Sequence, residues 1–177
     1  LATQLTAEND SFNNQYDKDA EYAVEVKTAD ELANALKAGG NVKLTADISV
    51  DKAVEIPAGV EVKLDLNGKT INTAYAEGST TNHVYAFTNK GDLLLKNGTV
   101  NARGIFNYGN MIIENATINA IDGNGGYAIR NYSGSTLTMN SGKIATTLED
   151  DHRSDEGGYD ATALRVDAGA SAVINGG

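Results

Sequence analysis

The sequence predicts an all-β solenoid of stacked parallel strands, preceded by a short helix that covers its first turn. Two observations predict the strands: a motif that recurs along the chain, and apolar residues that alternate with polar ones inside each copy. A helical pattern near the start predicts the cap. The composition agrees, because 19 glycines and a single proline suit many short strands joined by tight turns.

The repeat is clearest in two segments, FTNKGDLLLKNGTV at 87–100 and IFNYGNMIIENATI at 105–118, which align without a gap. A third copy at 129–144 has two extra residues in its middle turn, and a fourth occupies 164–177. Upstream, residues 62–71 match the second half of the unit. Such repeats indicate a solenoid, because one unit buries its inward face only when its neighbours stack on it.

Three asparagines, Asn89, Asn107 and Asn131, hold the same place in successive copies, and Val166 ends the series. Parallel stacking brings equivalent side chains together, so each amide can bond to the next one. Asparagine also tolerates the left-handed conformation that a sharp bend needs. We therefore predict a structural ladder of these three residues; the alternative is three unrelated surface turns.

The first element is a helix predicted at 29–38. Thr28-Ala-Asp-Glu31 is a capping box, in which Thr28 accepts from the helix backbone and Glu31 reaches back to Thr28. Gly39-Gly40 ends the helix. Its apolar residues share one face: Leu32, Ala35 and Leu36. This helix is placed to cover the core and strand edges that a first repeat would otherwise expose.

The segment TADELANALKAGG, followed by VKLTADISV and VEIPAGVEVKLDLNGKTI, resembles the opening of right-handed parallel β-helix proteins of the pectate-lyase-like superfamily. The resemblance is nearest to cell-surface and phage-borne members found around gut bacteria, and it covers residues 24–177. It implies a right-handed parallel β-helix. The superfamily includes polysaccharide lyases, pectin hydrolases, tailspikes, fibres and adhesins, so the fold alone does not choose the activity.

Charge and composition exclude several partners. The net charge of −10 and a pI near 4.5 disfavour nucleic acid, whose phosphates such a surface repels. No apolar run approaches the roughly 18 residues that a membrane helix needs, so we expect no membrane insertion. The chain has no cysteine, which excludes disulfides and thiolate metal sites.

The insertion TLEDDHRSDEGGYD at 147–160 is the segment on which the alternative of an enzyme depends. Its acids could bind a hard cation such as calcium, or pair as general acid and base; the candidate ligands are Asp150, Asp151, Asp155 and Glu156. The resemblance implies acids aligned across successive repeats, and for hydrolases a Gly-His-Gly segment, which this chain lacks. We therefore favour a solubilising loop and expect no cofactor, with calcium as the alternative.

Outward positions on the stacked repeats carry aromatic and cationic side chains. The candidate contacts for a glycan or a second subunit are Phe106, Tyr108, Arg130, Tyr132 and Arg165. Aromatic patches stack on sugar rings or bury against another subunit, and paired arginines can hold a sugar carboxylate. The alternatives are an ordinary pair of stacked tyrosines, and arginines neutralised by acids such as Glu114.

We expect residues 1–26 to form an extended anchoring arm, because residues 1–22 are polar and lack periodicity. Residues 27–177 form the solenoid, which we expect to continue beyond residue 177 because the last copy stops before its end. The predicted function is a non-enzymatic attachment protein: a bacteriophage virion fibre, of head or tail, that docks through its arm on a larger assembly and meets host-surface glycans. Alternatives are a polysaccharide lyase or hydrolase, and a bacterial cell-surface adhesin.

The expected location is the virion surface or the extracellular face of a cell. Fibres of the kind that the chain resembles imply a homo-oligomer, for example a trimer. Neither the ligand nor the host follows from the sequence.

Overall fold

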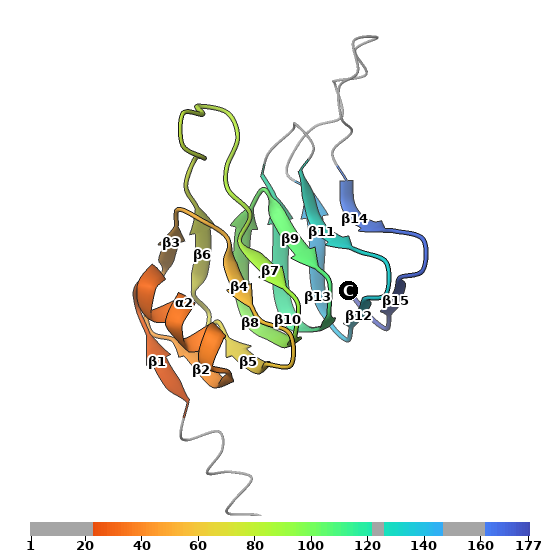
Figure 1. The fold of residues 1–177 in the computed structure, drawn as a ribbon, viewed down its shortest axis with the longest axis horizontal. Helices are drawn as coiled ribbons and strands as arrows, with labels where there is room; N and C mark the ends of the chain where they lie inside the picture. The colour runs from red at the N-terminus through yellow and green to blue at the C-terminus, as the bar shows by residue number, and fades with distance from the viewer. Residues whose placement is uncertain (1–22, 122–125, 147–161) are drawn as a thin grey trace, which may run out of the picture.

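The computed structural model describes residues 23–121, 126–146 and 162–177 (Figure 1). Within these ranges the chain is mostly β-strand with one short helix, and all pairings between the named strands are parallel. This confirms the all-β prediction with a single N-terminal helix.

The strands form two parallel sheets. The main path of the first sheet runs through β1 (Val24–Val26), β2 (Gly40–Leu44), β5 (Glu61–Asp65), β8 (Asp92–Ala102), β10 (Asn110–Ala120), β12 (Thr136–Met139) and β15 (Ser171–Ile174). Three strands pair beside this path: β3 (Ile48–Val50), β6 (Thr70–Thr73) and β13 (Gly142–Thr146). The second sheet has the order β14 (Thr162–Val166), β11 (Tyr127–Asn131), β9 (Gly104–Asn107), β7 (Phe87–Asn89) and β4 (Val54–Ile56).

Strand register follows the sequence repeat. Ile105 pairs with Phe87 on one side and with Ile129 on the other, and Leu93 pairs with Met111. Equivalent residues of successive copies are therefore direct neighbours across the sheets. The pairing shifts once, between Tyr127 and Ile129, where β11 leaves the register of β9.

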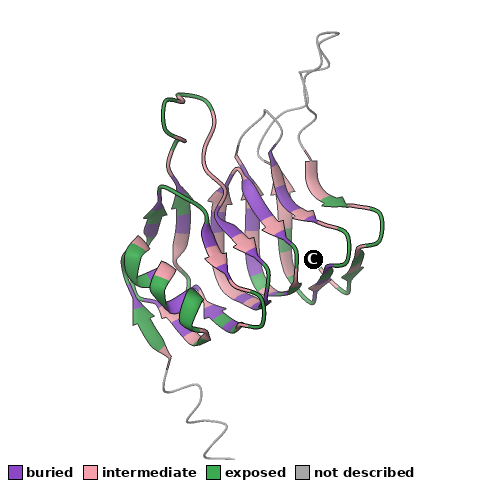
Figure 2. Cartoon of the chain, in the orientation of Figure 1, coloured by how far each residue is buried: buried purple, intermediate pink, exposed green. Residues whose placement is uncertain are grey.

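The inward residues of both sheets form one apolar core, drawn purple along the strands in Figure 2. Alternation places every second residue inside, so that Leu93 and Leu95 of β8 are buried while Asp92 is exposed. Burying a side chain of this size stabilises the fold by roughly 2 kcal/mol. The core is continuous from the helix to Met139.

The helix α2 (Ala29–Ala38) begins and ends where the sequence predicts, and it packs against β1 to β4. Its predicted apolar face is buried, and Thr28 Oγ1 accepts from the Glu31 N–H at 3.3 Å. The predicted partner of the Glu31 carboxylate was wrong. It accepts from the N–H of Lys27 at 2.8 Å rather than from Thr28, because the side chain reaches one residue past the cap.

Strand β1 lies within the segment predicted as an arm. Its three residues pair in parallel with β2, and Val26 is buried. The last part of the 1–26 segment therefore belongs to the first sheet, whereas residues 1–22 lie outside the described residues.

The Asn ladder (Asn89, Asn107 and Asn131) runs through the interior. Asn89 Nδ2 donates to Asn107 Oδ1 at 2.8 Å, and Asn107 Nδ2 donates to Asn131 Oδ1 at 2.6 Å. All three side chains are fully buried. Each amide nitrogen also donates to a backbone carbonyl of the next copy; the acceptors are those of Asn110, Thr136 and Ser171.

The expectation that the ladder asparagines adopt the left-handed backbone conformation was wrong. Among the described residues, the non-glycine residues with positive φ are Asn67, Asn97 and Asn115, at 51°, 60° and 50°. The ladder residues end extended strands instead, and their backbones are paired in register. The bends therefore use a second set of asparagines, in the turn after β5 and in the middle of β8 and β10.

Two turn glycines are required by close backbone approach. A Cβ added to Gly109 would overlap the carbonyl oxygen of Gly91, and one added to Gly91 would overlap that of Val60. Successive turns therefore stack backbone on backbone at this corner, where no side chain fits.

Replacing Asn107 with alanine should lower the free energy of unfolding by about 3 kcal/mol, because buried amide and carbonyl partners on both sides lose a bond. Asn101→Ala is the matched control. Asn101 also bridges two asparagines, Asn72 at 3.0 Å and Asn119 at 2.9 Å, but on the outer surface. Its loss should cost less than about 1 kcal/mol. Denaturant titration measures both, and equal costs would contradict a special role for the interior ladder.

Candidate functional site: a tyrosine–arginine face

The most elaborate side-chain cluster among the described residues lies on the outer face of the second sheet, over β9, β11 and β14. Strand register places Arg130 beside Phe106 on one side and beside Arg165 on the other. We call this cluster the tyrosine–arginine face; its members are Phe106, Tyr108, Tyr127, Arg130, Tyr132, Arg165 and Asp167. All five residues predicted as glycan or subunit contacts belong to it.

The aromatic rings of the face contact one another across the repeats. Tyr108 and Tyr132 stack with their centroids 4.1 Å apart and their planes inclined by 13°. Phe106 meets Tyr132 edge-on at 5.5 Å and packs against Tyr85 at 3.9 Å. Each such pair contributes roughly 1 kcal/mol beyond the area it buries. Tyr108 is 44% exposed, so part of its ring stays accessible to a ligand.

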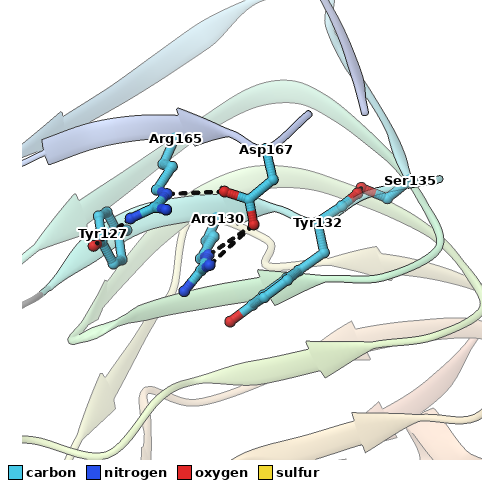
Figure 3. A network of polar contacts seen from close by, with 6 residues as sticks. All are labelled: Tyr127, Arg130, Tyr132, Ser135, Arg165 and Asp167. Carbon is cyan, nitrogen blue, oxygen red and sulfur yellow. Dashed lines mark hydrogen bonds and ion pairs between the residues drawn. The ribbon is translucent and has the colours of Figure 1, made fainter. Parts of the chain in front are cut away.

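Both arginines converge on one carboxylate (Figure 3). Arg130 donates through Nε and Nη2 to Asp167 Oδ2, at 3.1 and 3.0 Å. Arg165 donates through Nε to Asp167 Oδ1 at 2.8 Å, and through Nη1 to the Tyr127 hydroxyl at 3.1 Å. The carboxylate thus occupies the position between the guanidiniums in which a ligand anion would otherwise bind.

Each guanidinium also lies near an aromatic ring. The Arg130 carbon Cζ is 4.3 Å from the Tyr132 centroid, and the Arg165 Cζ is 5.5 Å from that of Tyr127. These cation–π contacts attract the guanidiniums to the tyrosine rings.

The acid that neutralises the arginines is Asp167, whereas the sequence suggested acids such as Glu114. Glu114 accepts from Asn140 at 3.2 Å, on the first sheet, and lies apart from Arg130 and Arg165. Asp167 was not singled out, although it holds the place of Tyr132 in the last copy. Tyr127 was also missed, because it precedes the part of the repeat that aligns.

The ionisation of the face is set by these contacts. The hydrogen bond from Arg165, supported by Arg130, holds the pKa of Asp167 below its usual range. The pKa of the Arg165 guanidinium is raised, first by the same hydrogen bond. Burial, together with a hydrogen bond to Tyr108, raises the pKa of Tyr132 to about 12. Near neutral pH the cluster therefore holds one carboxylate, two guanidiniums and a protonated Tyr132.

A concave region lies apart from this face, at the bends of the first sheet. A shallow depression of about 490 Å³ is lined by Asp65, Asn67, Gly68, Asn97, Gly98 and Asn115. Asp65 Oδ1 accepts from the Asn67 N–H at 2.8 Å and from Asn97 Nδ2 at 3.2 Å. The polar groups of this depression thus bond mainly to one another.

The weak calcium candidates Asp150, Asp151, Asp155 and Glu156 lie outside the described residues. Elsewhere, in the part of the chain that is described, no three His, Asp or Glu side chains gather in a way that could hold a metal ion. In that same part no helix is long and apolar enough to cross a membrane.

Comparison with known proteins gives no match. No family model matches it. No curated protein and no solved structure matches it either. The resemblance to the pectate-lyase-like superfamily therefore stays a prediction.

Asp167→Asn should destabilise the fold in a pH-dependent way. The pKa of Asp167 is lower in the folded state than its unfolded value of roughly 4, so ionisation stabilises the fold above that pH. This stabilisation is lost as the pH falls through the folded pKa. The difference in unfolding free energy between wild type and variant should be largest near pH 7 and should shrink as the pH falls below the unfolded pKa of roughly 4.

The control is Glu55→Gln, which removes a half-exposed ion pair with Lys90. It should cost less than Asp167→Asn at pH 7, because solvent screens that pair. Denaturant titrations at several pH values give both differences. An Asp167→Asn cost that does not change with pH would contradict the assigned ion pairs.

Proposed function

We propose that the chain is a right-handed parallel β-helix that serves as a non-enzymatic attachment module, a stiff shaft whose tyrosine–arginine face contacts surface glycans. The stacked Tyr108–Tyr132 pair beside two arginines carries this proposal. The resemblance of the N-terminal sequence supports the handedness and the β-helix architecture.

In-register pairing supports the role of a shaft. Each strand from β8 to β12 is bonded to a strand of the preceding repeat and to a strand of the following repeat, so bending the stack would break several backbone bonds together. The Asn ladder adds a buried line of amide bonds along the same direction. A stack joined in this way can hold a binding face at a fixed distance from an anchor.

The composition of the face supports sugar contact. Tyr108 has one side against Tyr132 and is 44% exposed, which leaves ring surface for the apolar side of a sugar. The guanidiniums carry further N–H donors beyond those bonded to Asp167 and Tyr127, and these suit hydroxyl or carboxylate acceptors.

The ionisation of the face favours binding over proton transfer. General acid–base catalysis works best with groups whose pKa lies near the working pH. The pKa of Tyr132 is about 12, and that of Asp167 is below its usual range. Both pKa values are therefore shifted further from neutral pH. The groups are suited to hold a ligand in a fixed protonation state.

We place the module on a bacteriophage virion or, as a second location, on a bacterial envelope. The polar sequence of residues 1–22 supports a role for the 1–26 segment in docking to a larger assembly. Assembly with further copies of the same chain belongs to this proposal.

The test is binding of the full chain to an array of neutral, uronic-acid and sialylated oligosaccharides, with mass spectrometry of the recovered sugars. We expect binding to at least one class and recovery of intact sugar. Tyr108→Ala should weaken that binding roughly tenfold, which corresponds to the loss of one stacking contact. Tyr108→Phe should preserve it.

The matched control is Tyr75→Ala. Tyr75 is 54% exposed but lies outside the tyrosine–arginine face. Its replacement should leave binding unchanged. Absence of binding by the wild type, cleaved sugars, or equal effects of the two alanine variants would each refute the proposal.

A further inference from the structure

The first sheet carries an unusual line of side chains on its outer surface. Strand register aligns Leu94 with Ile112, Ile112 with Thr138, and Thr138 with Val173. We call these four residues, three of them apolar and one a threonine, the apolar stripe; they lie on adjacent strands, about 4.8 Å apart. Ile112 is 40% exposed and Val173 is 52% exposed, while Leu94 and Thr138 are half-buried.

The stripe begins at β8. The same outward place in β5 and β2 holds Lys63 and Asn41, which are polar. Isolated apolar residues on a surface are ordinary, but three apolar residues aligned with a threonine on adjacent parallel strands form a surface that is normally covered.

We propose that the apolar stripe is the contact surface for a second copy of this chain, related by a two-fold axis that runs along the stacking direction. This inference deepens the proposed function. The role that we give the dimer, a shaft made of two chains, rests on that proposed function. The aromatic contacts of the tyrosine–arginine face lie on the other sheet and stay open to a ligand in this arrangement.

Flanking charges select this axis. On β8, Asp92 and Lys96 lie on opposite sides of Leu94. An axis along the stack reverses the strand direction but keeps each strand opposite its own equivalent. Asp92 then faces Lys96 of the second copy, twice by symmetry, while Leu94 and Ile112 meet their own equivalents.

The other two-fold arrangement is less favourable. An axis along the strands, centred on β10, would set Glu114 against Glu114 of the second copy. It would place no opposite charge of the second copy across from Asp92 or Lys96, and Lys96 would keep only the Asp65 carboxylate of its own chain, at 3.7 Å. Like charges placed opposite each other are destabilising, so electrostatic complementarity favours the axis along the stack. That axis also puts both α2 ends at the same end of the pair, as a common anchor requires.

The size of the patch indicates a weak dimer. Four strands at about 4.8 Å, each presenting about five residues at 3.3 Å, give an area of roughly 300 Å² per copy. Stable interfaces bury about 800 Å² per partner. We therefore expect a reversible dimer whose population depends on concentration, and which is reinforced when both copies are anchored on one particle.

Sedimentation equilibrium of the full chain over micromolar to millimolar concentrations should show the mass rising from one copy to two. Ile112→Lys should weaken this association at least tenfold, because it places a charge at the centre of the stripe. Val24→Lys is the matched control, since Val24 is an exposed valine outside the stripe, and it should have no effect. A mass that stays at one copy throughout, or that rises to three copies, would overturn the proposal.

Charge exchange tests the orientation. Asp92→Lys and Lys96→Asp should each weaken the dimer, and the double exchange should restore it. Failure of the double variant to recover would overturn the axis along the stack.

A cysteine variant gives an independent readout, because the chain has no cysteine of its own. Ile112→Cys should form a disulfide-linked pair under mild oxidation, since the axis brings residue 112 next to its equivalent. Glu55→Cys, on the second sheet, should stay unlinked. Equal linking of both variants would overturn the interface.

The two proposals fail separately. Ile112→Lys should keep the glycan affinity per chain, and Tyr108→Ala should keep the dimer. Loss of glycan binding with an intact dimer refutes only the sugar contact, and the reverse result refutes only this interface.

Discussion

Parallel in-register pairing between successive repeats is the constraint on which the rest of this molecule depends. Once Ile105 pairs with Phe87 and with Ile129, the strand positions that follow in the unit stack on their own equivalents. Apolar residues at an inward position then form a continuous row in the core. Polar residues at an inward position form a row of polar groups with no access to water. A buried amide must be bonded. The equivalent amide and the neighbouring carbonyl are within reach, which is why the interior polar column consists of asparagine; at its last member the buried Ser135 hydroxyl also donates to Asn131 Oδ1, at 2.7 Å.

The asparagine column begins at Asn89, where the preceding repeat offers no equivalent amide. Asn89 Oδ1 is buried and has no hydrogen-bond partner, because the preceding strand places Ile56 at the equivalent position. The column thus begins with an unpaired acceptor, a cost of roughly 1–3 kcal/mol that the bonds downstream offset. The same stacking acts outside, where it aligns Asn72, Asn101 and Asn119 in a surface ladder. It also aligns the Tyr108–Tyr132 pair and the apolar stripe.

Features that depend on pairing could be predicted from the sequence, and features that depend on side-chain reach could not. The repeat gave the partners of Asn107 and the neighbours of Arg130, because alignment of the copies is alignment of the strands. It did not reveal that Glu31 bonds to Lys27, or that Asp167 binds both Arg130 and Arg165. Those contacts depend on rotamers of long side chains between neighbouring positions. The left-handed residues were assigned to the wrong asparagines for a related reason, since the motif shows where turns lie but not which residue bends.

The internal ion pairs limit what the proposed glycan contact can recognise. Asp167 already accepts three hydrogen bonds from the two guanidiniums, so a sugar carboxylate entering between them would have to displace it or lie beside its charge. The remaining N–H donors belong to guanidiniums that lie beside the rings of Tyr127 and Tyr132. A sugar hydroxyl accepts from such donors without opposing the charge of Asp167, and a ring stacked on Tyr108 would bring its hydroxyls toward them. The arrangement is therefore better matched to neutral sugars than to acidic ones, although the face carries one net positive charge.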